Sequence, residues 1–180
     1  MVQAQSRTTD SLAEFLRSPN LEESPAWELF VGVVSQKPLP TLYHSILQKR
    51  LVSAIDGAGS DYEAFPELHC VLAENSIVPD VTVIGRGRCP LGNQPVSGPP
   101  DWLIEILSPD QSTTKLIAKI QACLVEGGHL GWLIDAEERV VMVFWPDRPL
   151  VLLRDDEVLP VLDAINLNLT VAQVFDWLPG

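Results

Sequence analysis

The alternation of apolar and polar positions in the first third of the chain predicts two helices separated by a strand. Apolar positions that follow a polar capping residue predict a short helix over residues 11–16. Residues 27–34 are rich in aliphatic and aromatic side chains and predict a strand that carries one acid, Glu28. Residues 37–40 predict a turn. Apolar positions recurring at three to five residues then predict a helix over 41–55, with a threonine cap.

The centre of the chain contains its most apolar segments. Short strands are predicted over 68–72, 77–84 and 102–107. The last of these begins after a double proline and carries a single carboxylate, Glu105, among hydrophobic neighbours. A carboxylate on a buried strand is costly unless it is paired, protonated or bound to a metal. Residues 108–110 supply a capping oxygen for an apolar helical stripe over 111–126.

The order of the predicted elements indicates an α/β fold, a mixed β-sheet flanked by helices. The remaining elements are strands over 131–134, 140–145 and 150–153, a terminal helix over 170–178 and an exposed loop over 86–100. The chain has 180 residues, 46% of them hydrophobic, which suits one core and a single domain. Within it we distinguish an N-terminal arm (8–58), a core (61–146) and a C-terminal part (149–178).

Composition excludes several classes of protein. The longest apolar run is shorter than a membrane span requires. Residues 1–7 lack the hydrophobic centre of a signal peptide, so a cytoplasmic location is expected. The three cysteines, Cys70, Cys89 and Cys123, are scattered, and they fit neither a disulfide framework nor a zinc pattern.

The charge balance restricts how the protein can meet nucleic acid. The formal net charge is −12, from 24 acidic and 12 basic residues. Such a balance opposes general, salt-driven coating of DNA. Any nucleic-acid partner must therefore bind at a local basic patch.

Two carboxylates and a lysine stand out against the apolar background. Asp80 follows a proline on one predicted strand, and Glu105 lies on the next. Lys119, or Lys115 one turn before it, lies on the following helix. Carboxylate oxygens suit Mg²⁺, which polarises a phosphoryl group and activates water. The lysine adds a positive charge that can orient the water or stabilise the developing negative charge.

The motifs around these positions resemble the Uma-two family, restriction-endonuclease-like proteins of the PD-(D/E)xK superfamily. The matching residues are Pro79-Asp80, the run from Pro99 to Pro109, Lys119, Gly127, the run from Trp132 to Asp135, and, towards the N-terminus, Trp27-Glu28-Leu29, Gly32 and His44. The resemblance covers nearly the whole chain. It implies a restriction-endonuclease-like fold and a metal-dependent endonuclease that hydrolyses nucleic-acid phosphodiesters. It also implies that Asp80 and Glu105 bind Mg²⁺ or Mn²⁺, with help from the Ile106 carbonyl.

The chain departs from the family pattern at the lysine. Leu107 stands where the superfamily's ExK lysine would be, so the lysine must come from the helix that follows. The family usually has an acid near Lys115 and a tyrosine near Cys123, and neither is present here. The alignment with the family points to Lys119, whereas Lys115 lies nearer the end of the strand. We predict Lys119 as the catalytic lysine and Lys115 as a neighbour that contacts substrate.

Other polar residues are assigned around this centre. Arg86 and Arg88, together with the two lysines, are predicted to form a local basic groove for substrate. His44 is predicted to lie on the helix surface or to line the pocket. Glu28 is a candidate accessory acid, which a salt bridge at the strand end would explain equally well. The tryptophans and Cys123 are predicted to be buried apolar residues.

Each assignment has a structural alternative. Asp80 can cap a turn or pair with Arg86 or Arg88, and Glu105 can form an ion pair with Lys119. The two lysines can also form an ordinary solvated helix face.

Three functions remain open after these alternatives are weighed. They are a Mg²⁺-dependent nuclease acting on nucleic acid, with DNA favoured; a nuclease fold that has lost turnover and serves as a binding or assembly module; and a phosphoesterase for other substrates. The apolar strands over 140–158, followed by the amphipathic terminal helix, leave partly covered faces. They predict a homodimer.

Overall fold

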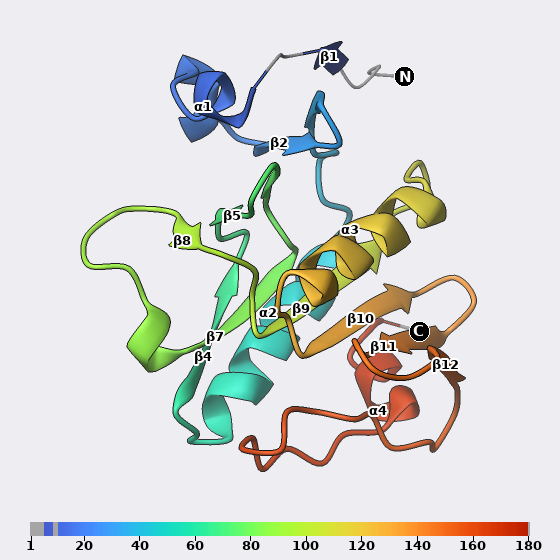
Figure 1. The fold of residues 1–180 in the computed structure, drawn as a ribbon. Helices are drawn as coiled ribbons and strands as arrows, with labels where there is room; N and C mark the ends of the chain where they lie inside the picture. Colours follow the sequence, from blue (N-terminus) through green and yellow to red (C-terminus); the bar gives the residue numbers. More distant parts are fainter. Residues whose placement is uncertain (1–5, 9–10, 180) are drawn as a thin grey trace.

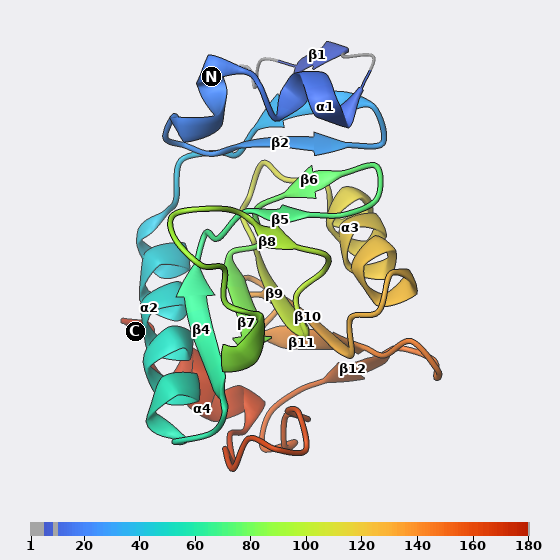
Figure 2. The same cartoon turned by 60° about the vertical axis from the view of Figure 1, so that its left-hand side comes forward.

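The computed structural model describes residues 6–8 and 11–179, and its strands form two six-stranded sheets (Figure 1). The main sheet has the order β12-β11-β10-β9-β7-β4, and the N-terminal sheet has the order β1-β3-β2-β6-β5-β8. Figure 2 shows the N-terminal sheet at the top of the view, with the main sheet and helix α2 below it. The predicted strands thus divide between two sheets.

The main sheet is mixed, with β9 at its centre. Its strands are β4 (Tyr62–Pro66), β7 (Val81–Gly85), β9 (Trp102–Leu107), β10 (Leu130–Asp135), β11 (Val140–Phe144) and β12 (Val151–Leu153). Strand β9 runs parallel to β10 and antiparallel to β7. Val81 lies opposite Ile104, so the preceding residue, Asp80, comes next to Glu105. All of these strands except β4 coincide with predicted segments to within one residue at the overhanging ends; β4 was missed.

Helices cover both faces of the main sheet, which is why β9 is apolar at nearly every position. Ile104 packs in one core cluster with Leu51 of α2, and Leu103 packs in another with Leu116 of α3. Alternate β9 side chains point to opposite faces, so Glu105 faces α3. A Cβ at Gly131 of β10 would lie 2.4 Å from Cγ2 of Ile120, so this glycine lets α3 approach the sheet closely. That approach brings the α3 side chains within reach of Glu105.

The N-terminal sheet corrects the prediction of one strand over 27–34. The segment forms an antiparallel hairpin of β2 (Trp27–Phe30) and β3 (Val33–Gln36). Val31 and Gly32 at its tip have φ of 51° and 71°, as a two-residue hairpin turn requires. Asn75 accepts a hydrogen bond from the Val31 amide. The other strands of this sheet are β1 (Ser6–Thr8), β5 (Cys70–Val71), β6 (Ser76–Ile77) and β8 (Val96–Ser97).

The four predicted helices are present. They are α1 (Leu12–Phe15), α2 (Leu42–Gly57), α3 (Thr113–Val125) and α4 (Val171–Phe175). Two short 3₁₀ turns, Pro19–Glu22 and Arg86–Arg88, follow α1 and β7. Thr41 and Thr170 cap α2 and α4 as predicted. Helix α3 is capped by Ser112 and not by residues 108–110.

Two residues placed on the predicted apolar stripes prove to be exposed. Leu42 in the first turn of α2 is 66% exposed, and Val125 at the end of α3 is 86% exposed, although His44 and Leu124 at the same helix ends are buried. Trp102, Trp132 and Cys123 are buried, as predicted. Trp145 and Trp177 were also predicted to be buried, but they are only partly buried. Within the described ranges, no helix is both long and apolar enough to cross a membrane.

Candidate active site

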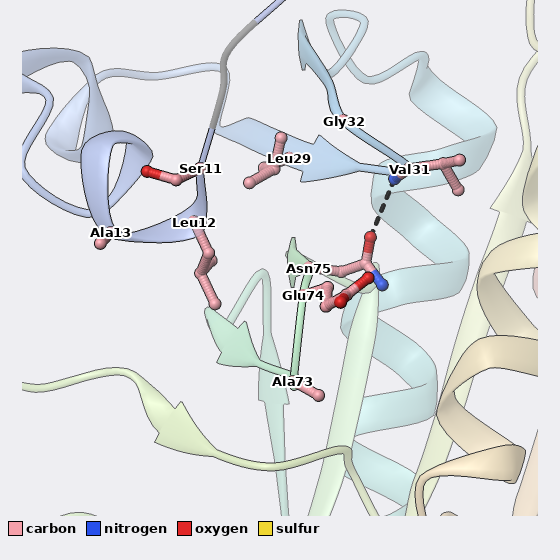
Figure 3. A pocket seen from close by; sticks show the side chains of 9 residues that line it. All are labelled: Ser11, Leu12, Ala13, Leu29, Val31, Gly32, Ala73, Glu74 and Asn75. Atoms are coloured by element: carbon pink, nitrogen blue, oxygen red, sulfur yellow. Dashed lines mark hydrogen bonds between the residues drawn. The ribbon is translucent and has the colours of Figure 1, made fainter.

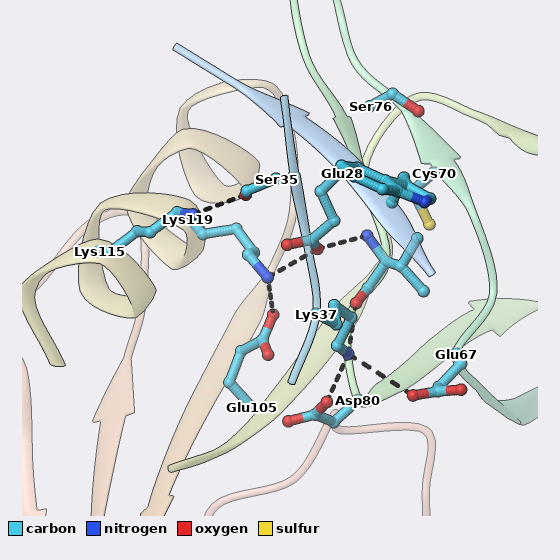
Figure 4. Close-up of polar contacts among 12 residues, drawn as sticks. Glu28, Ser35, Lys37, Glu67, Cys70, Ser76, Asp80, Glu105, Lys115 and Lys119 are labelled. Atoms are coloured by element: carbon cyan, nitrogen blue, oxygen red, sulfur yellow. Dashed lines mark hydrogen bonds and ion pairs between the residues drawn. The ribbon is translucent and has the colours of Figure 1, made fainter. Parts of the chain in front are cut away.

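Six ionisable side chains from both sheets and two helices meet in the interior. They are Glu28 of β2, Lys37 just after β3, His44 of α2, Asp80 just before β7, Glu105 of β9 and Lys119 of α3 (all but His44 drawn in Figure 4). None of the six is more than 8% exposed. The structure therefore brings together Asp80, Glu105 and Lys119, the three residues that the sequence singled out.

Asp80 is held on both of its carboxylate oxygens. Its Oδ1 accepts from Lys37 Nζ at 2.5 Å and lies 3.1 Å from His44 Nε2. Its Oδ2 accepts from the Ile106 amide at 2.7 Å. Burial by itself raises the pKa of Asp80, but the Lys37 ammonium and His44 overcome this effect and hold the pKa well below its usual range. Asp80 is therefore ionised across the physiological pH range.

The partners of Asp80 differ from those considered in the sequence. It pairs with neither Arg86 nor Arg88, because Lys37 and His44 occupy its Oδ1. His44 is buried beside Asp80 and does not lie on the helix surface. The Ile106 residue contributes its amide to Asp80, while a role for its carbonyl in metal binding stays a prediction.

Among the three buried carboxylates, Glu28, Asp80 and Glu105, the charge of Glu105 is the least well compensated. It is fully buried, and neither of its oxygens accepts a well-formed hydrogen bond from any described residue. The Lys119 ammonium lies 3.0 Å from Oε1 as an ion pair. Burial raises the pKa of Glu105 to about 7, since the attraction of Lys119 offsets only part of the cost and the neighbouring Asp80 charge adds to it.

Lys119 lies between two carboxylates and is only 2% exposed, so it does not belong to a solvated helix face. Its Nζ donates to Glu28 Oε1 at 2.7 Å, opposite its contact with Glu105. Burial would lower the pKa of Lys119, but these two carboxylates raise it above its usual value. The ammonium groups of Lys119 and Lys37 in turn lower the pKa of Glu28, again against the effect of burial. Lys119 is therefore a permanently charged donor and does not act as a base.

The predicted basic groove is occupied by other contacts. Arg86 pairs with Glu63 at 3.2 Å on the surface. Arg88 pairs with Asp101 at 2.7 Å and donates to the Pro99 carbonyl, which fastens the loop before β9. The exposed Lys115 donates to Ser35 Oγ at 2.9 Å, so it lies at the edge of the buried cluster (Figure 4). Of these cations, Lys115 is the one that lies beside the buried cluster, and its contact with substrate stays a prediction.

Lys37 is the site residue that the sequence analysis missed, because residues 35–40 were interpreted only as the end of a strand and a turn. Ser35 and Lys37 are two residues apart, and Ser35 lies opposite Glu28 in the hairpin. The two-residue period of a strand therefore places all three on one face. Polar residues at this spacing beside an acid on the partner strand were the available signal.

A pocket of about 620 Å³ lies elsewhere, between α1 and the turns at Val31 and Asn75 (Figure 3). Glu74 is its one ionisable described lining residue, and none of the six residues of the buried cluster lines it. We therefore identify the candidate site by its buried ionisable side chains and not by this pocket.

The donor set of the cluster fits a hard divalent cation. Asp80 and Glu105 offer carboxylate oxygens, and those of Glu105 accept no well-formed hydrogen bond from the described residues. Among those residues, no three His, Cys, Asp or Glu side chains converge as a ready-made metal cage. Two carboxylates completed by water and phosphate oxygens are the set that Mg²⁺ ordinarily uses in proteins.

Comparison with known proteins identifies the family and the fold of the chain. The family model Uma2, described as putative restriction endonuclease, matches residues 12–172. The crystal structure of a putative nuclease belonging to DUF820 from Anabaena variabilis is 37% identical to this chain, with a TM-score of 0.87. The match covers 94% of this chain and 99% of that one, and it confirms the predicted α/β nuclease-like fold. A search of curated proteins finds no significant match. The chain belongs to the Uma2 family, the putative restriction endonucleases.

Proposed function

We propose that this protein is an endonuclease that hydrolyses nucleic-acid phosphodiester bonds, with DNA as its substrate and Mg²⁺ or Mn²⁺ as its cofactor. The observation that carries the proposal is the buried arrangement of Asp80, Glu105 and Lys119, in which Glu105 is paired with Lys119 and accepts no well-formed hydrogen bond from the described residues. Membership of a nuclease family agrees with it.

Four residues of the cluster, Glu28, Asp80, Glu105 and Lys119, have distinct parts in this proposal. A divalent cation held by Asp80 and Glu105 would polarise the phosphoryl group and supply a water of lowered pKa. The Ile106 amide orients Asp80, and Glu28 orients the ammonium of Lys119. Lys119 donates to the negative charge that develops on the phosphate oxygens.

Binding of Mn²⁺ tests the metal site directly. We expect calorimetry to show Mn²⁺ binding to the wild type and none to Asp80→Ala, because that substitution removes one of the two ligand side chains. Asp61→Ala, which removes an exposed carboxylate outside the cluster, should bind Mn²⁺ as the wild type does. Equal heats from the wild type and Asp80→Ala would rule the site out.

Cleavage assays decide between the nuclease and its alternative, a nuclease fold that serves as a binding or assembly module. The alternative is favoured by one observation: both oxygens of Asp80 already have protein partners. We expect the wild type with Mn²⁺ to cut supercoiled plasmid, and single-stranded RNA tests the other substrate class. Binding of nucleic acid without cleavage of either substrate would favour the module.

A further inference from the structure

Lys37 has the closest contact to Asp80 of any described side chain, and the proposed function gives it no role. Its side chain is 5% exposed, and its Nζ lies 2.5 Å from Asp80 Oδ1 and 2.8 Å from the Val78 carbonyl. The ammonium therefore lies on the carboxylate that the proposed metal must share.

The charges of the cluster are nearly balanced by the protein itself. Three buried carboxylates, Glu28, Asp80 and Glu105, face the two buried ammonium groups of Lys37 and Lys119. Lys119 contacts the first and the last of these carboxylates, so Lys37 is the lysine that compensates Asp80. An uncompensated buried charge strongly destabilises a fold. Lys37 thus stabilises the metal-free protein, because its ammonium neutralises the negative charge of Asp80 that a bound cation would otherwise neutralise.

A second carboxylate lies ready to accept the Lys37 ammonium. Glu67 Oε1 is 4.0 Å from Nζ, and its side chain is 40% exposed, compared with 1% for Asp80. The Glu67 amide donates to the Asp80 carbonyl, which keeps the two acids side by side (Figure 4). A short movement of the flexible lysine side chain therefore exchanges a buried partner for an exposed one.

We propose that the Lys37 ammonium competes with the divalent cation for Asp80. When the metal binds, Lys37 leaves Asp80 and pairs with Glu67. The proposal rests on the metal-dependent function given above and adds the residue that sets the affinity. Lys37 acts through Asp80 and is a positioning residue. Its exchange moves one unit of positive charge out of the site as the cation enters.

Calorimetric titration with Mn²⁺ tests the competition. We expect Lys37→Met to bind Mn²⁺ about tenfold more tightly than the wild type, at the low end of typical coupling between two linked events. Lys49→Met removes the same charge from an exposed position of α2 and should change the affinity little. Unchanged or weaker binding by Lys37→Met would overturn the proposal while leaving the metal site intact. Failure of every protein, wild type included, to bind Mn²⁺ would overturn the proposed function as well.

Glu67→Gln separates an exchange of partners from a general effect of charge. In the wild-type background this substitution should weaken Mn²⁺ binding, because the displaced ammonium loses its partner. In the Lys37→Met background it should have no effect, since Glu67 acts only through Lys37. An equal loss in both backgrounds would show a simple long-range charge effect and would refute the exchange.

Thermal unfolding covers the case in which Lys37→Met is poorly folded without metal. The variant should have a lower Tm than the wild type in the presence of a chelator, because Asp80 loses its ammonium partner. Saturating Mn²⁺ should raise its Tm by more than it raises that of the wild type. A smaller or absent rise would contradict the proposal.

Discussion

Glu28 fixes two parts of the site with one oxygen. Its Oε1 accepts from Lys119 Nζ and from the Val78 amide, each at 2.7 Å. The carbonyl of the same Val78 accepts from Lys37. The segment leading into Asp80 is thus held on both sides by residues of the β2–β3 hairpin region. Glu28 therefore positions both Lys119 and the segment that leads into Asp80, the proposed metal-binding carboxylate.

Single substitutions should distinguish the two lysines of α3. Lys119→Ala should lower single-turnover plasmid cleavage by about 10²–10³, the usual effect of removing a donor that stabilises developing charge. Lys115→Ala should weaken substrate binding modestly and reduce its salt dependence, because Lys115 is exposed and contacts only Ser35 among the described residues.

Thermal unfolding provides the control for this comparison. Lys119→Ala leaves Glu28 and Glu105 without their shared cation and should cost about 3–5 kcal/mol of stability, as breaking a buried pair does. Rates are therefore compared at a temperature where both variants are folded. Loss of cleavage in Lys115→Ala alone would reverse the assignment.

His69, just before β5, joins the N-terminal sheet to α1. Its Nε2 lies 3.1 Å from the Trp27 carbonyl, which can only accept, so this nitrogen carries the proton. Its Nδ1 lies 3.1 Å from Ser76 Oγ and accepts from that hydroxyl when the ring is neutral. Phe15 stacks on the ring. The neutral imidazole thus satisfies both neighbours without a charge.

The stability of the protein should depend on pH through His69. Burial lowers the pKa of His69 below its usual 6.5, so the unfolded chain binds this proton more readily than the folded one. The contribution of the neutral ring is present above pH 6.5 and is lost as the pH falls through the folded-state pKa. Urea unfolding at pH 7 and pH 5 should show a larger loss of stability in the wild type than in His69→Gln. Parallel behaviour of the two proteins would contradict this account.

Elements with a sustained period or a clear capping residue could be predicted from the sequence, whereas the hairpin turn and one edge strand could not. The stripe of α3 and the apolar run of β9 gave the correct elements because burial on a sheet imposes a regular pattern. The hairpin turn was missed because Val31 adopts a left-handed φ that glycine or asparagine usually supplies. Strand β4 was missed because it is an edge strand with one buried residue, Ala64.

Some residues of the candidate site could be predicted from the sequence, and others could not. Asp80, Glu105 and Lys119 could be selected because their spacing matches a family motif and a buried carboxylate is costly. The contacts of Lys37 and His44 with Asp80 could not, since they depend on how the two sheets and α2 meet. The sequence did offer the ion pair between Glu105 and Lys119 as an alternative, and the structure contains it.

The whole molecule leaves one edge of its main sheet open. Strand β12 is last in the sheet order, and Leu150, Val151 and Leu152 are each more than a third exposed. An exposed apolar edge strand is a template for pairing with another chain. We therefore propose a homodimer, as the C-terminal strands had indicated, with antiparallel β12 strands at its two-fold axis.

Light scattering over a concentration series tests the dimer. We expect a mass twice that of the chain for the wild type and a shift towards the monomer for Leu152→Lys, because a charge at the pairing edge opposes association. Leu91→Lys, at a 96% exposed residue of the loop before β8, is the matched control. A monomeric mass for the wild type at high concentration would refute the dimer.

The residues of the buried cluster come from two consecutive segments of the chain. The loop at Gly59, after α2, separates a segment that carries Glu28, Lys37 and His44 from one that carries Asp80, Glu105 and Lys119. Helix α2 packs its buried Leu47 and Leu51 on the main sheet, so the two segments share a large apolar contact. Neither segment contains a complete set of charges. A chain split at this loop would therefore be a complementation reporter, in which cleavage returns only when the two fragments reassemble.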